Sequence, residues 1–425
     1  MKILTGSFAD LKQQVGQREA AAANNPEIEK IVADIITNVA QNGDAALREY
    51  SAKFDKVQID DFKVSQATID AAYAACSDDL IQALQLAKRN ITSYHKKEVT
   101  RGFIDCEQPG VIRGQKVTPL AAVGLYVPGG TAAYPSTILM AALPAKIAGV
   151  KDLVMVTPPQ PDGINPAVLA AAKIAGVDAI YQVGGAQAVA ALAIGTESIP
   201  RVDKIVGPGN VFVATAKKQV FGRVAIDMIA GPSEIGIIAD EFAKPKLVAA
   251  DLLSQAEHDK RARPMLVTPS LKLAEAVNEE ITKQLATLPR REIAQVSCDE
   301  VGFIAVVDQL DEAFKLMNVI APEHLEIQVQ SPTTYLNQIE NAGSIFLGEN
   351  ASEPLGDYVA GPNHILPTAG TARFFSPLGV EDFIKRSQFI EYTRDALATE
   401  KDAITTLART EGLEAHARAI EARFN

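Results

Sequence analysis

The chain has 425 residues, of which 47% are hydrophobic and 22% charged, a composition typical of a globular protein with a sizeable core and two or three domains. Its formal net charge of −11 argues against nucleic acid or an anionic membrane as a partner. The three cysteines lie far apart, which fits neither a disulfide framework nor a cysteine-based zinc site and favours a reducing cytoplasm.

The longest uncharged stretch, Leu120–Ala145, is long enough to span a bilayer. Prolines and glycines interrupt it, so we interpret it as a strand, a loop and a helix. The N-terminus has no apolar core of signal-peptide length before its first acidic residue, so secretion is not expected. We therefore expect a soluble, cytoplasmic protein without a membrane partner.

The N-terminal part is predicted to be mostly helical. Asn25 can cap a helix, Pro26 suits its first position, and Gly43 follows its predicted end. Apolar residues recur at helical spacing within it, which predicts one buried face. A second helix is predicted over Asp78–Val99, where His95 lies among charged residues and is interpreted as a solvated surface residue.

After about residue 110, short apolar segments alternate with helical segments of ten to fifteen residues. This alternation predicts parallel sheets built from strand–helix units. The predicted strands are 121–127, 152–159, 179–185, 204–210, 234–240, 264–270, 301–308 and 344–349.

Glycine turns mark the ends of three of these predicted strands, at 128–130, 184–185 and 207–209. Ligands of parallel sheets bind at the carboxyl ends of the strands, so these turns are candidates for nucleotide contact. The nearest match to GxGxxG begins at Gly207, but Phe212 stands where the last glycine belongs. Phosphate binding at these helix starts and simple strand–helix packing both remain open.

The C-terminal tail is predicted to be amphipathic helix from Gly379 onward, and such a tail often packs on another subunit. The apolar residues that suggest this are Phe383, Ile384, Phe389, Ile390, Ala403, Ile404, Leu407 and Ala408.

The segment LLSQAEHD, Leu252–Asp259, stands out because histidine is scarce, with five in the chain. We interpret it as the first turns of a helix. Residues three apart share a helix face, so Gln255 and His258 should point the same way and Glu257 should not. This spacing suggests a metal or acid/base site, and the alternative is an ordinary solvated His–Glu pair.

Four of the five histidines lie in the C-terminal half, each near a carboxylate or in a loop rich in turn formers. Besides His258, they pair as Glu323 with His324, Asp357 with His364, and Glu411 and Glu414 with His416. Histidine, aspartate and glutamine side chains can supply nitrogen and oxygen ligands to Zn²⁺. One Glu–His pair would then remain for acid/base chemistry.

These motifs resemble those of the histidinol dehydrogenase family. The matching segments are GLYVPGG, VGGAQAVAALAIGTESIPRVDKIVGPGN, IDMIAGPSE, DLLSQAEHD, APEHLEI and GDYVAGPNHILPT. They run in the same order from about residue 20 to the end, and motifs of this length are specific.

The resemblance implies an α/β fold with two incomplete Rossmann-like parallel-sheet domains. It places a helical N-terminal region at 1–105 and the first Rossmann-like domain at 106–122 and 236–376. The second, NAD-binding domain is expected at 123–235, and a helical C-terminal tail that contacts the dimer partner at 377–425.

The resemblance further implies oxidation of L-histidinol to L-histidinal and then to L-histidine, with two NAD⁺ as co-substrates. It implies one Zn²⁺ per subunit, with ligands at Gln255, His258, Asp357 and His416, the last from the other subunit of a homodimer. His324 would take the alcohol proton as general base, and Glu323 would activate the water that attacks the aldehyde.

Other matching positions are expected to bind substrate or NAD. Ser233, His364 and Glu411 match substrate contacts, as do the metal ligands and the Glu323–His324 pair. Tyr126, Gln187 and Asn210 match NAD contacts, and each lies at or just after a predicted strand end. Glu257 and Glu414 match no role.

Two other classes of function remain open at this point. One is a zinc hydrolase in which Glu323 is the base and the metal activates water. The other is a non-enzymatic dimer that uses zinc to clasp its tails. The glycine turns favour a nucleotide over both.

Overall fold

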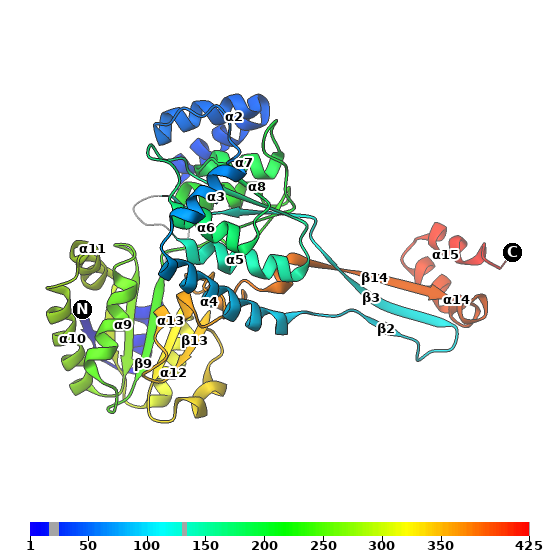
Figure 1. Ribbon diagram of the computed structural model, residues 1–425. Helices are drawn as coiled ribbons and strands as arrows, with labels where there is room; N and C mark the ends of the chain where they lie inside the picture. The colour runs from blue at the N-terminus through cyan, green and yellow to red at the C-terminus, as the bar shows by residue number, and fades with distance from the viewer. Residues whose placement is uncertain (17–24, 130–133, 425) are drawn as a thin grey trace. The chain divides into compact units, whose positions relative to one another are not determined.

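Figure 1 shows the computed structural model of the chain, which describes residues 1–16, 25–129 and 134–424. Its internal contacts divide the chain into two units. Unit 1 comprises Met1–Glu98 and Ala121–Phe383, and unit 2 comprises Val99–Leu120 and Ile384–Asn425. No helix within the described ranges is both long enough and apolar enough to cross a membrane.

One sheet of unit 1 is parallel, with the strand order β6-β5-β4-β7-β8. Counted along the chain from β4, this is the 3-2-1-4-5 order of a dinucleotide-binding sheet that lacks its sixth strand. The strands are β4 (Ala122–Tyr126), β5 (Asp152–Thr157), β6 (Ala179–Gln182), β7 (Lys204–Val206) and β8 (Ala225–Ile226). The connecting helices are α5 (Pro135–Ala148), α6 (Pro166–Ala175), α7 (Gly185–Ile194) and α8 (Val211–Val220).

The second sheet of unit 1 is also parallel, with the order β1-β11-β10-β9-β12-β13. Counted from β9 it repeats the 3-2-1-4-5 order, with the N-terminal strand added at the edge. The strands are β1 (Lys2–Leu4), β9 (Glu234–Ala239), β10 (Arg263–Thr268), β11 (Phe303–Val306), β12 (His324–Gln328) and β13 (Ser344–Leu347). The helices are α1 (Phe8–Gly16), α9 (Pro245–Ala256), α10 (Leu271–Leu285), α11 (Arg291–Val296) and α12 (Leu310–Ile320).

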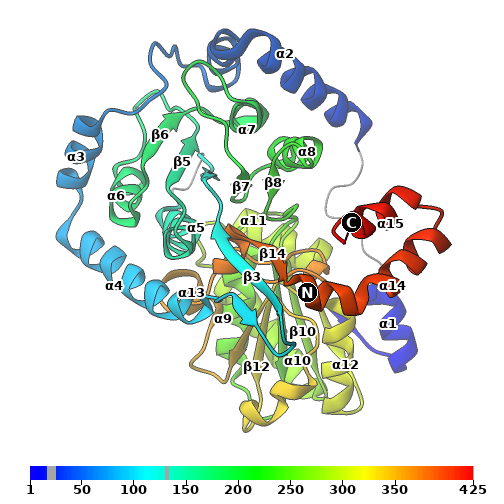
Figure 2. The ribbon, with the colours of Figure 1, turned by 90° about the vertical axis from the view of Figure 1, so that its right-hand side faces the viewer.

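These two sheets confirm the predicted α/β fold with two incomplete Rossmann-like sheets. Figure 2 shows them as separate layers, with β5 to β8 in the upper half of unit 1 and β10 and β12 in the lower half. β9 is buried along its whole length, as expected for a parallel strand with both faces covered.

The N-terminal helices α2 (Pro26–Tyr50), α3 (Gln66–Ala75) and α4 (Asp78–His95) confirm the predicted helical region. Asn25 caps α2, since its side chain accepts hydrogen bonds from the backbone of Glu27 and Ile28. Gly43 ends the first part of α2 as predicted, because its φ of 50° and ψ of −129° are not helical and two helical segments meet at a kink there. The Asp44 N–H, at the start of the second segment, donates to the Glu197 carboxylate (2.8 Å).

The interpretation of His95 as a solvated residue is wrong. Its side chain is buried, with 1% of its area exposed, and its Nδ1 lies 2.7 Å from the Glu98 carboxylate. The charged residues that follow it in sequence lie in a short 3-10 turn, Lys96–Glu98, and one of them folds back onto the imidazole.

Unit 2 is an antiparallel sheet followed by two helices. The sheet has the order β14-β3-β2, with β2 (Phe103–Asp105), β3 (Val111–Pro119) and β14 (Ile384–Tyr392). The helices α14 (Arg394–Thr410) and α15 (Glu414–Glu421) confirm the helical tail.

The predicted helix over the first part of the tail, which includes Phe389 and Ile390, is wrong. These residues lie in β14, which pairs with β3 along all of its nine residues. That ladder of backbone hydrogen bonds outweighs a local helical pattern.

The domain borders expected from the sequence remain a prediction. β3 comes from the expected segment 106–122 and pairs with β2 and β14 in unit 2. β1, from the expected N-terminal region, pairs with β11 of the six-stranded sheet.

Candidate active site

The expected catalytic residues lie at the amino edge of the six-stranded sheet. Glu323 directly precedes β12, and His324 is its first residue, paired in register with Ile235 near the start of β9. This departs from the usual rule that parallel sheets bind ligands at their carboxyl edge. The residues expected to contact the nucleotide do follow that rule, since they lie at the carboxyl edge of the five-stranded sheet.

His324 is held in one tautomer. Its imidazole is 4% exposed, and Nδ1 lies 3.0 Å from the carbonyl oxygen of Glu234, to which it must donate a proton. Nε2 therefore keeps its lone pair, and it is buried without a hydrogen-bond partner among the described residues. Burial lowers the pKa of His324 to about 3; the hydrogen bond to Glu234 opposes this shift, and the neighbouring His364 and His258 add to it. The ring is thus neutral and can accept a proton at Nε2.

Glu323 is bound to the same residue of β9. Its Oε2 accepts a hydrogen bond from the Glu234 N–H (2.8 Å) and lies 3.7 Å from His324 Nδ1. Burial raises the pKa of Glu323 well above its ordinary value, and nearby carboxylates, among them Asp357, add to the effect. One backbone position, Glu234, thus orients both members of the expected acid/base pair.

Asp357 and His364 complete the buried cluster. Asp357 lies in α13 (Glu353–Tyr358), and its Oδ1 is 3.8 Å from His324 Nε2 and 3.6 Å from His364 Nδ1. His364 Nδ1 donates to the Asp357 carbonyl (3.0 Å), while Nε2 accepts from the Thr137 hydroxyl (3.2 Å). Burial raises the pKa of Asp357 to about 6 and lowers that of His364 to about 4.

The contact between His364 and Thr137 joins the two sheets of unit 1. Thr137 lies in the first turn of α5, the helix that follows the carboxyl end of β4. Asn363 adds a second link, since its side chain donates to the carbonyl of Met140 in the same helix (2.7 Å). The amino edge of one sheet therefore meets the carboxyl edge of the other at this cluster.

Gln255 and His258 point the same way, as their spacing predicted. Gln255 Nε2 lies 3.1 Å from His258 Nδ1, and the fully buried Gln255 has an amide oxygen without a hydrogen-bond partner in the described chain. The predicted position of the motif in its helix is wrong, because it forms the last turn of α9, with Glu257 at the C-cap. Desolvation lowers the pKa of His258; the charge of Glu257 opposes this shift, and Arg290 and His364 add to it.

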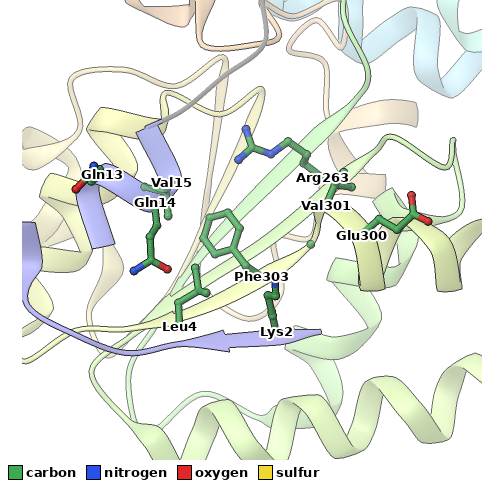
Figure 3. Close-up of a pocket in the computed structure, with 10 residues that line it drawn as sticks. Lys2, Leu4, Gln13, Gln14, Val15, Arg263, Glu300, Val301 and Phe303 are labelled. Carbon is green, nitrogen blue, oxygen red and sulfur yellow. The ribbon is translucent and has the colours of Figure 1, made fainter. Parts of the chain in front are cut away.

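Residues lining a cavity of about 270 Å³ include His324, Asp357 and His364, together with Phe346 and Leu355. A larger cavity of about 430 Å³ lies elsewhere in unit 1, against α1, β1 and β11 (Figure 3). The described residues that line it include Lys2 and Arg263 but no histidine. The smaller cavity is therefore the candidate active site.

Two carboxylates at the site were missed in the sequence. Glu353 is 2% exposed, and with His324 and Asp357 it forms a group whose potential ligand atoms lie within 4.8 Å of one another, close enough to hold a metal ion. Glu326 lies beneath it and accepts a hydrogen bond from the Glu353 N–H (2.8 Å). Burial raises the pKa of both carboxyl groups well above the ordinary range, and neighbouring carboxylates add to this. Helical spacing from Asp357 and strand alternation from His324 could have found them.

The expected NAD contacts lie together at the carboxyl edge of the five-stranded sheet. Tyr126 ends β4, and its hydroxyl accepts a hydrogen bond from the Gly185 N–H (3.1 Å) at the start of α7, the helix that carries the buried Gln187. Asn210 caps α8 through its side-chain oxygen. Gly130, part of one expected glycine turn, lies outside the described residues.

Three expected substrate or metal residues lie outside the buried cluster. Ser233 is half-buried just before β9, and its carbonyl accepts from the Arg263 N–H (2.9 Å). Glu411 and His416 belong to unit 2, where both are exposed, Glu411 at the end of α14 and His416 in α15.

The fold and the site define an α/β enzyme in which a buried, neutral imidazole can exchange protons next to a dinucleotide-type sheet. A sequence profile for histidinol dehydrogenase matches residues 18–424. The chain is 68% identical to the histidinol dehydrogenase of Lactiplantibacillus plantarum, covering 100% of this chain and 99% of that protein. For the Streptococcus mutans enzyme the identity is 56%, with the same coverage.

A solved structure is similar throughout. The crystal structure of histidinol dehydrogenase from Elizabethkingia anophelis has a TM-score of 0.95 and 38% identity, covering 100% of this chain and 98% of that one. The chain belongs to the histidinol dehydrogenase family. It is a dehydrogenase of histidine biosynthesis.

Proposed function

We propose that the enzyme oxidises L-histidinol to L-histidine through L-histidinal and reduces two NAD⁺. The observation that carries this proposal is the contact of His364 with Thr137, since it brings the His324 cluster to the carboxyl edge of a dinucleotide-type sheet. A hydride donor bound at the cluster would then lie next to a nicotinamide bound at that edge. Membership of the family supports this reaction over a zinc hydrolase or a non-enzymatic zinc clasp.

The first oxidation requires a group that takes the hydroxyl proton while hydride leaves the same carbon for NAD⁺. His324 Nε2 suits this role because Nδ1–H is fixed on the Glu234 carbonyl and the ring is neutral at physiological pH. The alcohol gives up one hydride and one proton, and L-histidinal and NADH result.

The second oxidation requires water to add to the aldehyde. Glu323 in its ionised form would remove a proton from that water, and its raised pKa makes the carboxylate a stronger base. The resulting hydrate gives a second hydride to NAD⁺ and becomes the carboxylate of L-histidine. The Glu234 N–H, which donates to Oε2, holds Glu323 in place for this step.

The donor types of the expected ligands suit a divalent metal. Gln255 has a buried amide oxygen without a partner in the described chain, and His258 and Asp357 offer nitrogen and oxygen donors. We propose that these three hold one Zn²⁺ per subunit, with His416 contributed by the second copy in a homodimer. Bound zinc would hold the imidazole and the amine of the substrate.

A different ligand set is available in His324, Glu353 and Asp357, which share only Asp357 with this proposal. We favour the first set because a zinc-bound Nε2 would leave His324 without the lone pair that the first oxidation needs. Metal analysis of Gln255→Ala and Glu353→Gln distinguishes the two. Loss of zinc in the Gln255 variant alone supports the proposal, and loss in the Glu353 variant alone contradicts it.

The remaining proposed contacts bind substrate or NAD. Ser233, His364 and Glu411 bind substrate, together with the metal ligands and the acid/base pair. Tyr126, Gln187 and Asn210 bind NAD at the carboxyl edge of the five-stranded sheet. The expected cytoplasmic location agrees with a biosynthetic role.

One assay tests the function directly. Purified protein is given L-histidinol and NAD⁺, and NADH and L-histidine are measured together. Two NADH per L-histidine are expected. One NADH with accumulation of aldehyde, or no turnover with zinc bound, would contradict the proposal.

A further inference from the structure

A buried polar network lies beneath the candidate active site and has no part in the chemistry proposed above. It consists of Asp251, Glu326 and Gln328, which are 9%, 1% and 4% exposed. Gln328 Nε2 donates to Asp251 Oδ2 (2.7 Å) and to Glu326 Oε2 (2.8 Å). Three polar side chains thus occupy a position where apolar packing would be the default. Gln328 Oε1 has no hydrogen-bond partner among the described residues, so the network is held through Gln328 Nε2, which binds both carboxyl groups.

The second oxygen of Glu326 caps a helix. Oε1 accepts from the N–H of Glu353, the first residue of α13. The N-cap residue, Ser352, makes no side-chain cap of its own, so Glu326 takes over that role from the neighbouring strand. Because α13 has only six residues, this one bond has a large share in fixing its start.

The network connects three elements that each carry a proposed active-site residue. Asp251 lies one helical turn before Gln255 in α9. Glu326 lies two residues after His324 in β12, and the helix that it caps carries Asp357. A further hydrogen bond from the Ser254 hydroxyl to Glu353 Oε2 (3.1 Å) links α9 to α13.

We propose that Glu326 is a positioning residue, which sets Asp357 and Gln255 relative to His324 through α13 and α9. The effect on substrate and zinc rests on the proposed function, whereas the effect on α13 does not. A merely structural role would lower stability and leave the amino-alcohol site of the folded protein unchanged. A positioning role predicts a selective change at that site.

Two variants of Glu326 separate its parts. Glu326→Leu removes both acceptors. Glu326→Gln keeps an oxygen for the Glu353 N–H, but its amide nitrogen replaces the oxygen that accepts from Gln328 Nε2, so it retains the helix cap and loses that link to Gln328. Ser297→Ala is the matched control, because it removes a buried hydrogen bond to the Ala262 carbonyl (2.8 Å) elsewhere in unit 1.

Holoenzyme of each variant is assayed for release of zinc to a chelator and for the KM of L-histidinol and of NAD⁺. Removal of groups that orient metal ligands typically costs about 10- to 100-fold in metal affinity or activity. We expect a change of that size in zinc release and in the KM of L-histidinol for Glu326→Leu. A smaller change is expected for Glu326→Gln, and none in the KM of NAD⁺ or in the control.

Hydrogen exchange of metal-free protein provides a measurement that does not depend on zinc or turnover. The amides of α13 should exchange about 10-fold faster in Glu326→Leu than in wild type or in Ser297→Ala, because the helix has lost its cap. Glu326→Gln should restore slow exchange. If Glu326→Leu does not fold, Gln328→Leu tests the link to α9. This variant keeps the hydrogen bond between Glu326 and Glu353, so faster zinc release is expected without faster exchange in α13.

The outcomes keep the two proposals apart. Unchanged exchange in α13 together with unchanged zinc release in a folded Glu326→Leu would overturn the positioning role. The wild-type protein could also fail to hold zinc and to oxidise L-histidinol while α13 exchanges faster in Glu326→Leu. That result would support the link from Glu326 to α13 and overturn the proposed function. Equal effects on both KM values would also contradict a selective role.

Discussion

Replacing His324 by Asn should make the metal-free protein less sensitive to acid. The wild-type imidazole is held neutral in a buried site, and its pKa is about 3, against about 6.5 in an unfolded chain. As the pH falls below about 6.5, the unfolded state therefore binds a proton that the native state does not, and stability is lost until the pH reaches about 3. Asn keeps a side-chain N–H for the Glu234 carbonyl but has no such proton to bind.

The size of the effect follows from the pKa difference. A pH of about 5 lies about 1.5 units below the pKa of the unfolded imidazole. At about 1.4 kcal/mol per unit, the wild type loses roughly 2 kcal/mol of unfolding free energy relative to about pH 7.5. His364, with a pKa of about 4, adds a loss that is common to both proteins. Wild type should thus lose roughly 2 kcal/mol more than His324→Asn over this interval.

The assay is urea unfolding at the two pH values, followed by circular dichroism, with metal removed throughout. Ser297→Ala is the control, because it removes a buried hydrogen bond without removing a titrating group. The difference between wild type and variant is read from the midpoints at constant slope. An equal loss of stability in wild type and His324→Asn would refute the neutral, buried state of this imidazole.

Three further predictions concern activity and metal. His324→Asn in zinc-loaded enzyme should lower turnover by about 10²- to 10⁴-fold with zinc retained, and full activity would remove His324 from the mechanism. His416→Ala and Gln255→Ala should each weaken zinc binding, and mixed heterodimers should regain part of the activity; absence of complementation would place each site within one chain. Thr137→Val removes the hydroxyl that donates to His364 Nε2 and should raise the KM of L-histidinol by about 2- to 10-fold, the usual worth of one hydrogen bond between neutral groups. An unchanged KM would show that His364 needs no such support.

The elements of both parallel sheets could be predicted because their patterns are local. An apolar run followed by a glycine turn and a helix describes β4 with α5 or β6 with α7 equally well in sequence and in structure. The spacing of Gln255 and His258 also predicted their shared direction correctly. Such features depend on residues within one or two turns of each other.

Features that depend on distant partners could not be predicted. β14 has a helical pattern in sequence, and only the presence of β3 along its whole length makes it a strand. His95 stands next to charged residues in the sequence, which suggests a solvated position, but the chain turns back so that Glu98 contacts the buried imidazole. Helix and strand spacing place Glu353 with Asp357 and Glu326 with His324, but the hydrogen bond between Glu326 and Glu353 forms only when β12 and α13 come together.

The meeting of the two sheets has a consequence for recombining relatives of this enzyme. The loop 359–368 and helix α5 are joined through His364 with Thr137 and Asn363 with the Met140 carbonyl, and Thr368 accepts from the Gly231 N–H (2.6 Å). A chimera that takes its five-stranded sheet from one parent and its six-stranded sheet from another would mix the two sides of this seam. A chimera that takes both α5 and the loop 359–368 from the same parent preserves these contacts. Neither sheet can therefore be exchanged by itself as an independent module.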